Sequence, residues 1–472
     1  YSTLQTLVEN STFENTHALL GGAVAVFGQG LTVLNSTFTR NGPQGLDFAS
    51  GRTDNAGASI YYRSTYPMMV KSCVFTELYP ITSWGWLTGG YIAVETPYVC
   101  TLEPTPVHQI EDCRFGAVSP DFIPMKGSLA VKKGHAIAVL GESPANTGAL
   151  STCVSNPQPT RLELINNSYG PCLSFSSGGC VYVENVADVH VLGGDVESGE
   201  TRDFHPVGGG FLGATGTDSM TGAMDITIED LEFLAGGIFL SPLGGIVAVD
   251  GGTAQMSLKL VGMELPRGHA KAKGGVVHAT GLVSLNVSDC TFRDSTAVSH
   301  GGALCVYDTE AVYLGDCTFT KNGVTSSKGS AGGHAYFGDV VEIVIERSDF
   351  LEGSNPEVVS NGGCLLAEYL TETAEFSLVA RDTLFQRCQI PQEPTSAVAI
   401  SNSIENGVVT LENVTLDDYP GVALSSYVSL NASSLRAFDV GSSVAIIFVQ
   451  GDFVEVRGMV ASGITGKLFI FS

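Results

Sequence analysis

A tetrapeptide recurs along this chain at nearly constant intervals, and the interval restricts what the chain can fold into. Asp-Cys-Thr-Phe at residues 289–292 returns 27 residues later at residues 316–319, and Gly-Gly-Ala-Leu lies between the copies at residues 301–304. Asn-Ser-Thr-Phe, Gly-Gly-Ala-Val and Asn-Ser-Thr-Phe follow one another in the same order between residues 10 and 38. A period of this length indicates a solenoid, in which each repeat buries its apolar face only by stacking on its neighbours.

The repeat is built from strands. Apolar residues alternate over strand-length runs, such as residues 340–345, that are rich in Val, Ile, Phe and Tyr. Turn-forming Gly, Asn, Asp and Ser bound these runs, and no stretch sustains a helical period. Roughly three short strands and three turns per repeat make one coil of a β-helix. The sequence therefore predicts an all-β fold, a right-handed parallel β-helix with loop excursions.

Aromatic residues and double glycines each recur at a fixed position of the repeat. Aromatic residues are predicted to stack inside the coils as one ladder, formed by Phe13, Phe38, Phe292, Phe319 and Phe350. Double glycines are predicted to form a second ladder at a turn that needs positive φ or close backbone approach. These pairs begin at residues 178, 209, 236, 274, 301, 332 and 362.

The chain of 472 residues has a formal net charge of -25, and only 15% of its residues are charged. An acidic surface repels phosphate backbones, which makes nucleic acid an improbable partner. The sequence has no Asp-x-Asp-x-Asp-Gly loop, so we expect no dedicated calcium site and no cofactor.

The pattern predicts a single domain, because a solenoid grows by adding coils. Irregular stretches predict excursions at about residues 76–112, 119–160 and 197–220 within the domain 1–472. No run of eighteen apolar residues is present, so we expect no transmembrane segment. The start at Tyr1 without Met indicates a processed or truncated product.

Four of the eleven cysteines stand two residues before a phenylalanine. Equivalent positions on adjacent coils lie about one strand spacing apart, near the Cα separation of a disulfide. We therefore expect one bridge between Cys290 and Cys317 and a second between Cys73 and Cys113. The alternative is a ladder of buried free thiols.

Six Asn-x-Ser/Thr sequons lack a central proline, and each is a candidate glycosylation site or an asparagine turn. They are Asn10, Asn35, Asn166, Asn286, Asn413 and Asn431.

A Gly-Gly-Ala-apolar motif followed by Phe-x-x-Asn occurs at residues 21–24 with 38–41, and again at 301–304 with 319–322. In this pairing the chain resembles the polymorphic outer-membrane proteins of chlamydiae and related β-helix surface proteins. The resemblance implies a secreted or surface-displayed β-helix. The C-terminal membrane barrel of the bacterial members has no counterpart in the sequence.

β-Helices also include enzymes that cleave polysaccharides, which need two carboxylates at a set separation. Asp417 and Asp418 form the only Asp-Asp pair, and the companion motifs of polygalacturonases are missing. Residues 381–385 resemble a pectin methylesterase stretch without its partner motif. The four histidines nearest the glycine turns are expected to face solvent without a catalytic or metal role. They are His269, His278, His300 and His334.

These features together predict a secreted, non-enzymatic structural protein that self-associates in an extracellular fibre, appendage or cell-surface coat. Both ends of the chain read as strands without a polar cap. A monomeric adhesin or carbohydrate-binding β-helix is the alternative, and a polysaccharide lyase or hydrolase is the third possibility.

Overall fold

A computed structural model describes most of the chain. The described residues are 4–18, 20–42, 54–78, 86–97, 106–116, 130–141, 160–174, 177–202, 207–216, 223–234, 237–252, 254–326, 332–354, 362–369, 376–388, 396–402, 407–419, 422–426, 429–440, 447–449, 453–464 and 469–471.

The described residues form strands joined by turns, and strands of successive coils pair in parallel. This arrangement is the predicted parallel β-helix. The chain divides into two compact units. Unit 1 holds Tyr1–Pro242 and Ile246–Ser257, and unit 2 holds Leu243–Gly245 and Leu258–Ser472. The prediction of one domain over 1–472 stays a prediction.

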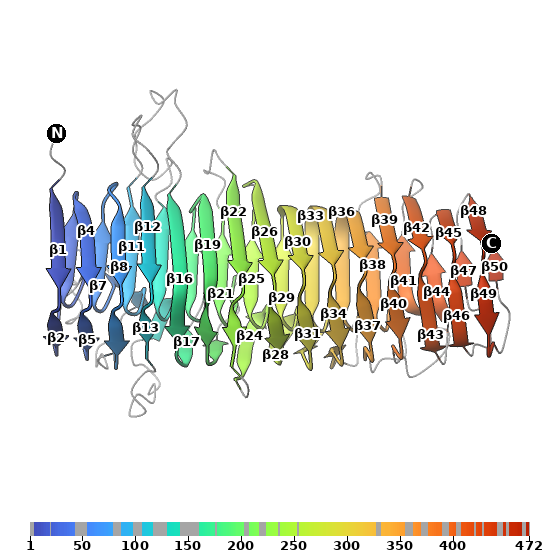
Figure 1. Ribbon diagram of the computed structural model, residues 1–472, viewed down its shortest axis with the longest axis horizontal. Coiled ribbons are helices and arrows are strands. Elements are labelled where there is room, and N and C mark those ends of the chain that lie inside the picture. Colours follow the sequence, from blue (N-terminus) through green and yellow to red (C-terminus); the bar gives the residue numbers. More distant parts are fainter. Residues whose placement is uncertain are drawn as a thin grey trace, which may run out of the picture. The chain divides into compact units, whose positions relative to one another are not determined.

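Three strands follow one another in a coil. The first-face strand follows the glycine turn, the second-face strand comes next, and the third-face strand carries the ring ladder. Many coils add a short strand before the next glycine turn. Figure 1 shows the second-face strands β1, β4, β8 and β12 of unit 1 side by side in chain order. Two strands of unit 2, β33 (Leu304–Gly315) and β36 (Ala335–Glu346), run through both the first and the second face.

The first-face strands are β3 (Val24–Phe27), β7 (Ile60–Arg63), β11 (Ile92–Thr96), β15 (Ile137–Gly141), β18 (Val181–Glu184), β21 (Leu212–Thr215), β25 (Val247–Asp250), β29 (Val277–Thr280), β38 (Leu365–Tyr369), β41 (Ser396–Asn402), β44 (Val422–Ser426), β47 (Ile447–Val449) and β50 (Phe469–Phe471). The second-face strands are β1 (Gln5–Glu9), β4 (Gly30–Leu34), β8 (Met68–Lys71), β12 (Val107–Glu111), β16 (Arg161–Tyr169), β19 (Asp188–Val196), β22 (Met224–Glu229), β26 (Met256–Val261), β30 (Leu282–Ser288), β39 (Phe376–Arg381), β42 (Gly407–Glu412), β45 (Ser429–Ser433) and β48 (Val454–Arg457).

The third-face strands are β2 (Thr12–Glu14), β5 (Thr37–Thr39), β9 (Val74–Thr76), β13 (Arg114–Phe115), β23 (Glu232–Phe233), β27 (Glu264–Pro266), β31 (Thr291–Arg293), β34 (Thr318–Thr320), β37 (Asp349–Leu351), β40 (Leu384–Gln386), β43 (Thr415–Tyr419), β46 (Arg436–Val440) and β49 (Val460–Ser462). The short strands are β6 (Asp54–Ala56), β10 (Trp86–Thr88), β14 (Ala130–Lys133), β17 (Cys172–Ser174), β20 (Gly199–Thr201), β24 (Phe239–Leu243), β28 (Gly268–Lys273), β32 (Thr296–Ala297) and β35 (Gly323–Val324).

The ring ladder is confirmed within each unit. In unit 2 the rings of Phe292, Phe319 and Phe350 stack with centroids 4.6 Å apart and planes within 2° of parallel. In unit 1 the rings of Phe13 and Phe38 stack at 5.0 Å. All of these rings are buried except that of Phe13, which is half-buried because it belongs to the first described coil.

The glycine ladder is confirmed at most of the predicted turns. Gly301 has φ 58°, and a Cβ on Gly302 would lie 2.2 Å from the carbonyl oxygen of Gly333 on the next coil. The pair beginning at 236 needs correction, because Gly244, with φ 60°, occupies the ladder position directly before Gly245 and the first-face strand β25.

All three predicted excursions contain strands of regular coils, since β21 also lies within 197–220 and pairs with β18 and β25. β11 pairs with β7 and β15, and β12 pairs with β8 and β16, so residues 76–112 include coil strands. β14 and β15 likewise lie within 119–160. The prediction counted prolines as a sign of irregular structure. Pro97 and Pro106 instead lie just outside strands, where the missing N–H costs no ladder hydrogen bond.

Candidate functional site

The four cysteines in phase with the ring ladder are buried and carry free thiols, so the predicted bridges Cys290–Cys317 and Cys73–Cys113 are not present in the structure. Each Sγ instead donates to the carbonyl two residues earlier, at 3.2 Å for Cys317 and Gly315 and at 3.3 Å for Cys73 and Lys71. Side chains at equivalent positions of stacked parallel strands run side by side. Their Cβ atoms are then about 4.8 Å apart, more than the roughly 3.8 Å of a disulfide.

Serines at the same coil position make the same contact. Ser348 Oγ donates to the carbonyl of Glu346 at 2.9 Å and accepts the backbone N–H of Cys317 at 3.1 Å. Ser36 bonds in the same way to Leu34 and Ser11. The cysteine column is therefore a structural corner, as in the free-thiol alternative.

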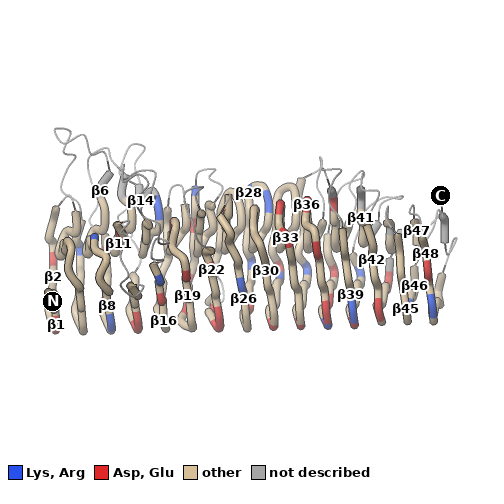
Figure 2. Tube along the Cα trace, turned by 90° about the horizontal axis from the view of Figure 1, so that it is seen from above, with Lys and Arg blue, Asp and Glu red and all other residues tan. Residues whose placement is uncertain are grey.

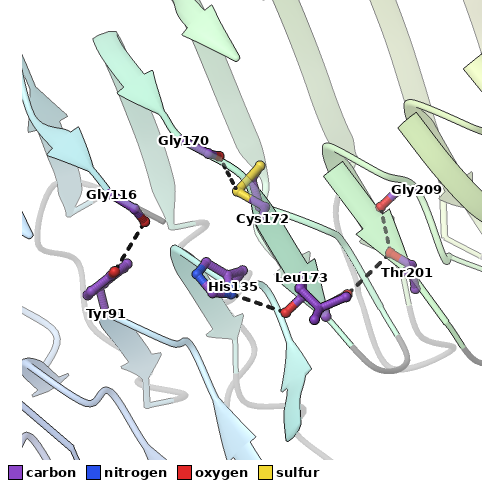
Figure 3. Close-up of a disulfide and its surroundings, with 10 residues drawn as sticks. Tyr91, Gly116, His135, Gly170, Cys172, Leu173, Thr201 and Gly209 are labelled. Carbon is purple, nitrogen blue, oxygen red and sulfur yellow. Dashed lines mark hydrogen bonds between the residues drawn. A yellow bond between two sulfur atoms is a disulfide. The ribbon is translucent and has the colours of Figure 1, made fainter. Parts of the chain in front are cut away.

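The disulfides of the described residues join a different pair of columns. They are Cys172–Cys180 and Cys364–Cys388, with sequence separations of 8 and 24. Cys180 and Cys364 each follow a glycine pair, and Cys172 and Cys388 each stand three residues after a ring of the ladder. The offsets of these cysteines from the glycine pair and from the ring can be read from the sequence, but the sequence alone does not show that the two columns face one another. Figure 3 shows the first disulfide beside Leu173, whose carbonyl accepts a hydrogen bond from His135 Nδ1 at 3.1 Å.

The second disulfide lies beside a buried histidine. Ligand atoms of His334, Cys364 and Cys388 lie within 4.8 Å of one another. Asn322 Oδ1 accepts the backbone N–H of Ser295, which points its Nδ2 toward His334 Nδ1 at 3.1 Å.

This contact fixes the tautomer of His334. Nδ1 must accept from the amide, so the proton resides on Nε2, which is buried without a hydrogen-bond partner. A metal-bound imidazole normally binds through one nitrogen and donates from the other. Because Nδ1 of His334 faces a donor and the two sulfurs are joined, the corner does not fit a metal ion.

Two of the histidines near glycine turns are buried, contrary to the expectation that they face solvent. Burial lowers the pKa of His278 to about 4 and that of His334 to about 3, so both imidazoles are neutral at neutral pH. Burial also lowers the pKa of His135, which directly follows the turn glycine Gly134, to about 4. His269 and His300 are half-buried.

The sequons fall mostly at bends. Four of the asparagines are exposed and adopt a left-handed conformation, with φ between 47° and 53°: Asn10, Asn35, Asn166 and Asn413. This geometry supports the asparagine-turn interpretation and leaves their side chains accessible to a glycan. Asn431 is exposed on β45, whereas Oδ1 of Asn286 on β30 is buried.

The carboxylates of the Asp-Asp pair contact different neighbours. Asp417 accepts a hydrogen bond from Gln386 Nε2 at 2.6 Å, and Asp418 pairs with Arg387 at 3.1 Å. Arg387 also lies 3.7 Å from Glu352, which lies 3.9 Å from Lys321, so charges alternate in sign along this bend. Figure 2 shows basic and acidic residues interspersed among the coils of unit 2.

No helix among the described residues is long and apolar enough to span a bilayer. No protein-family model matches the chain, and neither the curated proteins nor the solved structures contain a significant match.

Proposed function

We propose that this protein is a secreted, non-enzymatic structural protein whose copies associate into an extracellular fibre, appendage or cell-surface coat. The observation that carries the proposal is that the reactive side chains of the described residues contact other parts of the coils. Thiols and imidazoles fill corner columns inside the coils, and Asp417 and Asp418 are bonded to the neighbouring coil. Side chains used in this way stabilise a stack of coils and do not converge on a substrate.

Two observations support an extracellular location. The described residues contain two disulfides, which persist in oxidising compartments. The Gly-Gly-Ala and Phe-x-x-Asn repeats resemble those of surface-displayed β-helix proteins, which fits the same location.

Exposed apolar side chains support self-association. Leu7 on β1 is 60% exposed. In unit 2, Phe453, next to β48, is 56% exposed and Val460 on β49 is 53% exposed. Exposed apolar side chains favour contact with another chain, and we assign this contact to a second copy of this chain.

Sedimentation velocity over a range of protein concentrations, with negative-stain microscopy, tests the association. The wild-type chain should form larger species as concentration rises, and Leu7→Lys and Phe453→Lys should return it to the monomer. A charge at these positions opposes burial of the exposed apolar side chains in an interface. Met69→Lys, at an exposed apolar position of the interior strand β8, is the matched control and should leave association unchanged.

A chain that stays monomeric at high concentration overturns the structural assignment and favours a monomeric adhesin. Release of reducing ends from polygalacturonate by the wild-type chain would contradict the non-enzymatic part of the proposal.

A further inference from the structure

Each unit contains a lysine that directly precedes a turn glycine and whose ammonium group lies over a tyrosine ring. In unit 1, Lys133 directly precedes Gly134, and its Nζ is 4.5 Å from the ring centroid of Tyr182. In unit 2, Lys273 directly precedes Gly274, and its Nζ is 4.1 Å from the ring centroid of Tyr307. Cation–π contact accounts for both placements.

The two lysines differ in their counter-ion. Nζ of Lys133 lies 2.8 Å from Glu184, which also accepts the hydroxyl hydrogen of Tyr182 at 2.8 Å. Glu184 stands six residues after the turn glycine Gly178, on the coil that follows Lys133. On the coil that follows Lys273 the turn glycine is Gly301, and the residue six positions after it is Tyr307. Among the described side chains, no carboxylate forms a salt bridge with Lys273. In a chain with a net charge of -25, the partner that the described residues give this ammonium group is a ring.

Polar and aromatic groups surround the ammonium group of Lys273. His300 is its direct neighbour on the next coil, and the ring of His300 packs edge-on against Tyr336 at 4.6 Å. His278 lies 6.1 Å from Tyr307, is only 6% exposed, and has no hydrogen-bond partner at Nδ1. Burial, with a smaller contribution from Lys273, lowers the pKa of both histidines to about 4. Lys273 is therefore the single positive charge of this group.

A glycine makes room for the ring of Tyr307. A Cβ on Gly338 would lie 2.7 Å from Cδ1 of Tyr307, so any larger residue would displace the ring. Tyr307 rests there beside Tyr336, with centroids 5.1 Å apart, and the Tyr336 hydroxyl donates to Glu368 at 2.9 Å. Lys273, His300 and Tyr307 are half-buried, so solvent reaches the group.

We infer that Lys273, His300 and Tyr307 form a binding site for a saccharide that carries a carboxylate. The ligand's carboxylate takes the role that Glu184 has beside Lys133. The exposed part of the Tyr307 ring offers apolar contact to a sugar. Ser299 Oγ donates to the Ala272 carbonyl and accepts from His300 Nδ1, so Nε2 of His300 accepts a hydrogen bond from a sugar hydroxyl. One cation among neutral polar groups matches one carboxylate per sugar, whereas a phosphorylated or strongly acidic peptide is recognised by a cluster of basic side chains.

Isothermal titration calorimetry with a tetramer of glucuronic acid tests the site, with a neutral glucose tetramer and tetraglutamate as comparison ligands. The wild-type chain should bind the acidic saccharide in preference to both. Lys273→Met should weaken binding about tenfold or more, because it removes a charged hydrogen bond. Lys273→Arg should retain most of the affinity, and Lys133→Met is the matched control that should not change it.

Tyr307→Glu places a carboxylate where Glu184 stands in unit 1, and it should abolish binding by neutralising Lys273 from within. Thermal melting of each variant checks that it is folded. Equal affinity for the neutral tetramer, no binding of the acidic tetramer, or unchanged binding by Lys273→Met overturns the site. Tighter binding of tetraglutamate overturns the saccharide assignment. The binding measurement does not depend on self-association, so either proposal can fail while the other holds.

Discussion

Asn322 shows at the scale of one residue why Phe-x-x-Asn recurs in this chain. Its Oδ1 accepts the N–H of Ser295, and its Nδ2 donates to the carbonyl of Phe292 on the preceding coil at 2.9 Å. Asn41 makes the equivalent contacts with Thr16 and Phe13. At this corner the backbone bends away from its neighbour, and the amide supplies the donor and acceptor that the ladder would otherwise provide.

Asn322→Leu should destabilise its corner, because it leaves a buried N–H and a buried carbonyl unsatisfied at about 1 to 3 kcal/mol each. Hydrogen exchange should become faster at the amides of residues 292–297. Asn322→Asp keeps the acceptor for Ser295 but sets a buried oxygen against the Phe292 carbonyl, so it should not restore the protection. Unchanged exchange in the leucine variant would show that the amide is dispensable.

Phe319→Ala should cost about 3 to 5 kcal/mol in the free energy of unfolding, since it leaves a cavity between two stacked rings. Phe13→Ala should cost less, because that ring is half-buried. Urea denaturation followed by circular dichroism measures both. Equal losses for the two variants would contradict the dependence on burial.

At the scale of the coil, columns of like position hold neighbouring strands in register. Rings, glycines and corner hydrogen bonds each repeat once per coil, so a slip by one residue would break all of them together. The disulfides add a covalent link between the column after the glycine pair and the column after the ring strand.

Paired replacement of Cys364 and Cys388 by Ala should destabilise the chain by about 2 to 4 kcal/mol, through the entropy of the unfolded loop that the bridge closes. The matched replacement of Cys290 and Cys317 by Ala removes two unbonded thiols instead. The thermal midpoint of each variant is measured with and without a reducing agent. Reductant should lower the midpoint of the Cys364/Cys388 variant less than that of the wild type. It should lower the midpoint of the Cys290/Cys317 variant as much as that of the wild type. Peptide mapping that finds Cys364 and Cys388 unpaired in the oxidised protein would refute the prediction.

At the scale of the whole molecule, the buried histidines make stability depend on pH. The pKa values of His135 and His278, about 4, and of His334, about 3, lie below the ordinary value of 6.5. As pH falls below 6.5 the unfolded chain binds protons on these groups, while the folded chain does not until near pH 4. Their stabilising contribution is complete above pH 6.5 and is lost toward pH 4.

The thermal midpoint should therefore fall between pH 6.5 and pH 5, over a range where most carboxylates stay ionised. His278→Gln should reduce the slope of this decline, because it removes one of the groups that takes up a proton on unfolding. A midpoint that is flat across this range would contradict neutral, buried imidazoles.

The sequence by itself determined the repeat, the strand pattern, and which side of each strand faces inward. Its period and the alternation of side chains are local properties, and so the inward place of Phe319 and the turn at Gly301 follow from the sequence alone. Pairing around a corner was decided only by the tertiary structure. Cys290 and Cys317 share a phase and stay apart because stacked side chains run parallel, whereas Cys172 and Cys180 differ in phase and meet because the chain turns between them. The place of Tyr307 beside Lys273 likewise follows from which coil stacks on which, a relation that no single repeat contains.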